Sequence, residues 1–206
     1  MENDVKDFLS ELLKQLKSID YIKPEDIPNI DLYMDQVTTF MDEQLAASKR
    51  YESDKILTKT MINNYAKNNL LPSPDKKKYS KEHVLTLLFI YYFKNILSIN
   101  DIRSILNPLT EKYFGNDDGF TMQDVYTEVF GLEAEESQKL LKDFGKKYKI
   151  AGETFEDFPA EDQKFLHTFS FICMLSFDVY IKKMLIERMI DDLNEEKEAS
   201  KKTGSN

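Results

Sequence analysis

Apolar residues recur every three or four positions along most of the chain, the spacing expected of amphipathic helices. The first predicted helix covers residues 4–19, and a second extends from a cap at Asp31 to about residue 46. Further helices are predicted over 58–70, 81–96 and 98–106, with Thr58, Ser80 and Ser98 as N-caps. Others follow from 121, over 134–148, and from Pro159 to about Leu193. No useful strand-like alternation is found, so the sequence predicts an all-α helical bundle.

The segment 58–70 predicts a helix with two chemically different faces. Its apolar stripe consists of Met61, Ile62, Tyr65 and Ala66. The opposite face contains no aspartate or glutamate, and it consists of Lys59, Thr60, Asn63, Asn64 and Lys67. After the helix, Pro72 and Pro74 indicate a turn, and three consecutive lysines follow as Lys76, Lys77 and Lys78.

The charge distribution distinguishes this region from the rest of the chain. The net charge is −9, which by itself argues against a nucleic-acid binder. Residues 55–104, however, carry 9 bases and 3 acids, a local charge of +6 between two acidic flanks. Lysines suit phosphates, and an asparagine amide can bind the edge of an adenine. A solvated helix face is the simpler interpretation of these residues taken alone, but together they favour contact with double-stranded DNA.

The order of these parts resembles the DNA-binding domain of the MerR transcription regulators. That family has a recognition helix, a basic wing, a long helix and a serine-led fourth helix, matched here by Thr58–Leu71, Pro72–Ser80, Lys81–Ile96 and Ser98–Leu106. Residues 56–106 also resemble an uncharacterised bacterial domain-of-unknown-function family. The MerR resemblance implies a winged helix-turn-helix with a short β-like wing. It also implies a transcriptional regulator in which Asn63 and Asn64 read bases and the lysines hold the backbone.

An alternative keeps the helix-turn-helix fold as a protein–protein interaction module without DNA binding. Its motivation is the acidic net charge and the absence of the arginines that MerR relatives carry. A third class, a small-molecule binder or enzyme built on the aromatic C-terminal half, has less support. No glycine-rich phosphate loop or nucleophile elbow occurs, and His167 and Cys173 lack helical ligand spacing. We therefore predict no enzyme activity, no metal and no cofactor.

We expect a helix-turn-helix domain over 1–110 with its core at 56–106, a helical region over 111–193, and a disordered tail over 194–206. The C-terminal apolar stripe is wide, and burial in the core of this half is the preferred interpretation. A dimer interface or a pocket for an apolar effector is the sharper one, and a homodimer is expected because groove readers commonly pair. The stripe consists of Phe165, Leu166, Phe169, Ile172, Cys173, Leu175, Phe177, Tyr180, Ile181, Met184, Leu185 and Met189. The N-terminus is acidic, and the apolar segment 165–181 is short and contains His167 and Asp178, so we expect a cytoplasmic protein without membrane contact.

Overall fold

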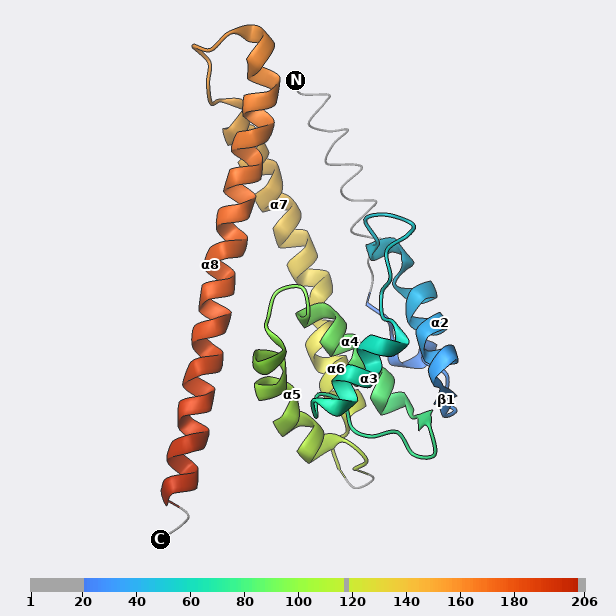
Figure 1. The fold of residues 1–206 in the computed structure, drawn as a ribbon. Helices are drawn as coiled ribbons and strands as arrows, with labels where there is room; N and C mark the ends of the chain where they lie inside the picture. The colour runs from blue at the N-terminus through green and yellow to red at the C-terminus, as the bar shows by residue number, and fades with distance from the viewer. Residues whose placement is uncertain (1–20, 117–118, 204–206) are drawn as a thin grey trace. The chain divides into compact units, whose positions relative to one another are not determined.

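The computed structural model describes residues 21–116 and 119–203 (Figure 1). The helix predicted over 4–19 lies outside these residues. Contacts divide the described chain into two compact units. We call residues 21–131 with 187–203 the core unit, and residues 132–186 the hairpin.

The core unit is built mainly from helices, with one small antiparallel sheet. Its helices are α2 (Met34–Gln44), α3 (Lys59–Lys67), α4 (Lys81–Phe93), α5 (Ile99–Tyr113) and α6 (Met122–Gly131). The strands β1 (Leu32–Tyr33) and β2 (Lys78–Tyr79) pair antiparallel, with Leu32 opposite Tyr79. Short 3₁₀ turns occur at Pro24–Asp26 and Ala46–Ser48. The prediction of a mostly helical fold is confirmed.

Helix α4 forms the centre of the core unit, because its side chains are apolar on every face. Every residue from His83 to Tyr91 is buried, and α4 contacts α5, α6 and β2. Phe89 packs edge-on against Tyr126 of α6 at 5.5 Å between ring centroids. The Tyr126 hydroxyl donates to the carbonyl of Ile22 at 2.9 Å, which ties α6 to the start of the described chain.

The predicted N-caps are occupied as expected, and one helix start differs. Thr58 Oγ1 accepts from the Met61 N–H, and Ser98 Oγ from the Asp101 N–H, each at 3.2 Å. Ser80 precedes α4, and its N–H donates to Nδ1 of His83 at 3.0 Å. The prediction that Asp31 caps α2 is wrong, because pairing with β2 holds residues 32–33 extended and α2 begins only at Met34.

The hairpin consists of α7 (Glu133–Gly152) and the first part of α8 (Ala160–Thr203). Tyr148 and Phe171 pack edge-on at 5.3 Å between ring centroids. Lys147 donates to Asp143 at 2.5 Å and also to Asp178, and these hydrogen bonds raise the pKa of Lys147. Near the loop, Nε2 of His167 lies 2.8 Å from the carbonyl of Thr154.

Two expectations for α8 are corrected. The C-terminal stripe is not buried in a core: ten of its twelve side chains are exposed, Cys173 among them. Among the described residues of the hairpin, the helix that packs beside it is α7. The helix also continues to Thr203, although we expected a disordered tail from residue 194. Residues 194–202 are mostly good helix formers, and Nζ of Lys197 donates to the carbonyl of Ser104 at 2.7 Å. No described helix is long and apolar enough to cross a membrane.

Candidate nucleic-acid interface

Helix α3 presents the two faces that its sequence predicts. Ile62 and Tyr65 are buried, and Met61 is half-buried. All five residues of the opposite face are exposed, namely Lys59, Thr60, Asn63, Asn64 and Lys67. The first turn contains no acidic residue, so the partial positive charge of the helix N-terminus is not neutralised from within α3.

The C-terminal end of α3 is closed by a left-handed residue. Asn69 has φ of 55°, and the Leu70 N–H donates to the carbonyl of Tyr65 at 2.8 Å. This is the bonding pattern of a Schellman motif, with asparagine in the position that glycine usually takes. Asn68 and Asn69 are exposed, so they extend the uncharged amide surface beyond Asn64. Sequence reasoning did not include them, although asparagine just after a helix is a known stop signal.

The three lysines lie on a tight turn, Asp75–Lys78, which we call the lysine turn. The Lys78 N–H donates to the carbonyl of Asp75 at 2.7 Å. Lys76 and Lys77 have φ of 47° and 67°, so both central residues are left-handed, as in a type I′ turn. Side chains with a Cβ adopt this region at a cost in energy. Lys76 and Lys77 are exposed at the tip, whereas Lys78 is half-buried.

The lysine turn and the N-terminal end of α3 both contact residues at the start of α2. Nζ of Lys78 lies 5.5 Å from the centroid of the Tyr33 ring. Two residues along the chain, Asp35 forms an ion pair with Lys59. Both groups of this pair are largely exposed, at 60% for Lys59 and 72% for Asp35, so the pair contributes little to stability. Sequence reasoning missed Asp35, because no local spacing relates it to Lys59.

The long segment between α2 and α3 is fastened at several points, which fixes where α3 begins. Nζ of Lys94 donates to the carbonyl of Ile56 at 2.7 Å, and burial lowers the pKa of Lys94. Nζ of Lys49 donates to Asp42 at 2.7 Å, and this hydrogen bond lowers the pKa of Asp42. The hydroxyls of Ser48 and Tyr91 also share a hydrogen bond. The segment is long, but α2 and α4 hold it.

His83 packs against Tyr79, the residue that follows the lysine turn, and lies between two aromatic rings. Its ring meets Tyr79 edge-on at 5.5 Å and Phe114 at 4.7 Å. Because Nδ1 accepts the Ser80 N–H, this nitrogen carries no proton in the arrangement observed. Burial lowers the pKa of His83. His83 is thus a packing and capping residue that joins β2 to α4.

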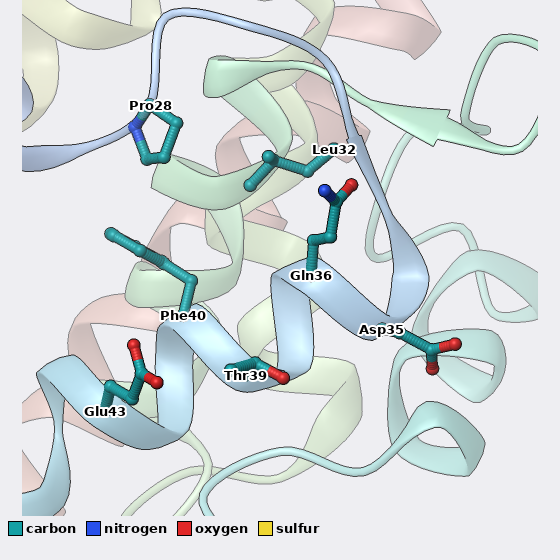
Figure 2. A pocket seen from close by; sticks show the side chains of 7 residues that line it. All are labelled: Pro28, Leu32, Asp35, Gln36, Thr39, Phe40 and Glu43. Carbon is teal, nitrogen blue, oxygen red and sulfur yellow. The ribbon is translucent and has the colours of Figure 1, made fainter.

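A shallow pocket lies on the outer side of α2 (Figure 2). Pro28 and Leu32 form one wall, while Gln36, Phe40 and Glu43 project from the helix. Asp35 and Thr39 complete the lining. The pocket is apolar with two acidic residues at its margin, which suits a protein side chain better than a phosphate. Among the described residues, no group of three His, Cys, Asp or Glu side chains is arranged to hold a metal ion.

A protein-family comparison places the core unit in a defined class. The family model described as "Domain of unknown function (DUF1836)" matches residues 22–129. This match covers more than half of the chain, and the protein therefore belongs to the DUF1836 family. No curated protein and no solved structure matches the chain.

Proposed function

We propose that this DUF1836 protein is a DNA-binding transcriptional regulator whose core unit acts as a MerR-like winged helix-turn-helix. In this proposal α3 is the recognition helix, and β2 with the lysine turn is the wing. Asn63 and Asn64 read base edges in the major groove. A homodimer is expected, because groove readers commonly bind two half-sites.

One observation carries the proposal. An exposed helix face without acidic residues begins beside a turn of three lysines, and both contact the start of α2, through Lys59 and Lys78. Phosphates favour such a site, since lysine meets them as a point charge. Lys59, Thr60 and Lys67 then hold the flanking backbone, while Lys76 and Lys77 reach phosphates from the tip of the turn.

DNA binding at several salt concentrations tests the proposal. Fluorescence anisotropy with fragmented genomic DNA compares the wild type with Lys76/Lys77/Lys78→Ala. We expect the substitutions to weaken binding and to reduce the slope of log affinity against log salt by about 2 to 3, because each phosphate contact contributes roughly 0.9. The control, Lys142/Lys146/Lys149→Ala, removes the same charge from the exposed side of α7. No binding by the wild type at low salt, or equal losses in both variants, would contradict the proposal.

Asn63→Ala and Asn64→Ala test the reading of bases separately. We expect overall affinity for random DNA to change little and selected-sequence preference to relax at one position per asparagine, at about 1–3 kcal/mol for each lost bidentate contact. Selection from a random DNA library gives this preference directly. An unchanged selected sequence in both variants means that α3 does not read bases.

The pocket on α2 favours a second candidate, a protein–protein interaction module without DNA binding. Phe40 and Leu32 offer an apolar site, and the carboxylate of Glu43 would attract a basic partner. In this case Phe40→Ala abolishes partner capture, and the lysine-turn variant has no effect on function in the cell. The DNA-binding candidate therefore predicts that function is lost in the lysine-turn variant, and the interaction-module candidate predicts that it is lost in Phe40→Ala.

A further inference from the structure

Asp35 is an acidic residue in contact with the basic face of α3. It lies in the first turn of α2, and its carboxylate forms an ion pair with Lys59, the first residue of α3. Figure 2 shows the Asp35 side chain projecting away from that of Phe40. The exposed face of α3 contains no acidic residue of its own, so Asp35 supplies from another element a negative charge that this face lacks.

The start of α2 contacts two lysines of the proposed DNA-binding surface, and it does so in two different ways. Nζ of Lys78 lies over the uncharged ring of Tyr33, and this contact leaves the charge of the ammonium group uncompensated. Lys59 is paired with a full negative charge on Asp35. Lys59 must therefore share or leave this carboxylate when it binds a phosphate, whereas the contact between Lys78 and Tyr33 involves no competing anion.

Neither the position nor the stability of α3 depends strongly on this ion pair. Its two groups are 60% and 72% exposed, and pairs of this kind contribute little to folding. Thr58 caps α3 by accepting a backbone N–H at 3.2 Å, and Lys94 holds the segment before it. Asp35 also interacts favourably with the N-terminal end of α2, but that role alone predicts no effect on DNA binding. The main consequence of the pair is to neutralise a positive charge where a phosphate is expected.

We propose that Asp35 competes with DNA phosphates for Lys59 and so limits the affinity of the core unit for DNA of any sequence. This inference rests on the proposed function and names a further residue of the same surface. Sequence-independent affinity comes from phosphate contacts and the counterions that they release, so a lysine that stays paired with Asp35 contributes less than a full contact. The proposed base contacts of Asn63 and Asn64 lie about one turn further along α3, so the preferred sequence should not depend on Asp35.

Binding of the full chain to fragmented genomic DNA, measured by fluorescence anisotropy at several salt concentrations, tests the inference. At about 0.1 M salt we expect Asp35→Asn to bind about threefold to tenfold more tightly than the wild type, the order of effect expected for one nearby charge in water. Its slope of log affinity against log salt should be steeper by up to about 0.9, because Lys59 becomes a full phosphate contact. Unchanged or weaker binding by Asp35→Asn overturns the inference.

Glu43→Gln is the matched control, because it removes the same charge from an exposed position on the same helix. Residues 35 and 43 are about 12 Å apart along the axis of α2, which exceeds the screening length of about 10 Å at 0.1 M salt. We expect this control to change DNA affinity by less than about twofold. Equal gains in Asp35→Asn and Glu43→Gln would mean that net charge alone sets the affinity, and they would overturn the inference.

Lys59→Met separates competition for the lysine from general repulsion of DNA by the carboxylate. Without Lys59 no phosphate is held beside residue 35, so adding Asp35→Asn to Lys59→Met should raise DNA affinity by about twofold or less. A gain equal to that in the wild-type background overturns the inference. So does a changed sequence preference in Asp35→Asn, which would mean that Asp35 reads a base.

Failure of the proposed function and failure of this inference give different results. Absence of DNA binding by both the wild type and Asp35→Asn at low salt contradicts both. If the wild type binds through the lysine turn and Asp35→Asn binds no more tightly, the inference alone fails. Urea unfolding should show that Asp35→Asn is no more stable than the wild type, because the substitution removes a favourable charge from the start of α2. A gain in stability together with a gain in affinity would assign the effect to folding and overturn the inference.

Discussion

Helix α4 and the part of α8 from Phe165 to Ile181 are both rich in apolar residues, yet they lie in opposite environments. In α4, Val84, Leu88 and Ile90 are fully buried. In α8, Phe165 and Phe177 are 70% and 64% exposed. The two helices are therefore distinguished by what packs on them and not by their hydrophobicity.

The reason is the number of neighbours that each helix has within its own unit. Helix α4 is enclosed by α5, α6 and β2, and the hydroxyl of its buried Thr86 is satisfied by the Glu82 carbonyl at 2.8 Å. Among the residues of the hairpin that the structure describes, α7 contacts one side of α8 through Tyr148 and Lys147. An apolar helix indicates that burial is needed, but it does not indicate whether the same chain or another one provides the cover.

A matched pair of leucine substitutions tests this difference and has the largest expected effect. Leu88→Ala removes a fully buried side chain from α4 and should lower the free energy of unfolding by about 2–5 kcal/mol. Leu185→Ala changes a side chain that is 60% exposed, and it should cost less than about 1 kcal/mol in dilute protein. Urea unfolding followed by circular dichroism measures both. Equal losses would mean that the α8 surface is covered within the monomer.

Acid should weaken the core unit through His83, which the aromatic rings enclose. Burial holds the pKa of His83 below its ordinary value of about 6.5 in the folded state. The unfolded chain therefore takes up a proton first as the pH falls. Stability is fully present above about pH 6.5 and declines below it, by at most about 1.4 kcal/mol per pH unit.

His83→Gln isolates this contribution, because glutamine preserves the capping arrangement with Ser80 and does not titrate. Urea unfolding at pH 7.5 and 5.5 should show a smaller loss of stability in His83→Gln than in the wild type. The variant also loses the packing of the His83 ring against Tyr79 and Phe114, which lowers its stability at both pH values. The informative quantity is therefore the difference in stability between the two pH values. An equal acid loss in both proteins would contradict a role for His83.

Much of the fold could be predicted from local sequence signals. Thr58, Ser80 and Ser98 were recognised as helix starts because a cap is a short-range interaction. The two faces of α3 were recognised because burial of Ile62 and Tyr65 follows from a 3.6-residue period. The candidate site residues themselves are exposed as expected, with Lys78 half-buried.

Features that depend on distant partners could not be predicted in the same way. The start of α2 is set by pairing between residues 32–33 and 78–79, which no pattern within residues 31–46 reveals. The ion pair between Asp35 and Lys59 also joins separate elements. The exposure of the α8 stripe was not predicted, because periodicity gives the width of an apolar face but does not show whether another element packs on it.

Substitution in the lysine turn has the smallest expected effect on the free energy of unfolding. It should change stability and DNA binding in opposite directions. Lys76→Asn/Lys77→Gly introduces the residue pair that a type I′ turn prefers. Because Lys76 and Lys77 both have positive φ, relief of that strain should raise the free energy of unfolding by about 1 kcal/mol. Urea unfolding gives this value, and a destabilised variant would show that the lysines are held by contacts that favour them.

The same variant should bind DNA more weakly, with a salt slope smaller by about 2. Higher stability together with weaker DNA binding would indicate that the strained turn serves DNA binding, because backbone strain persists where the surrounding structure and a function require it. Lys142/Lys146→Ala on α7 removes two charges without changing the turn and should leave both quantities nearly unchanged. A rise in stability with unchanged DNA binding would instead assign the lysines of this turn to solvation alone.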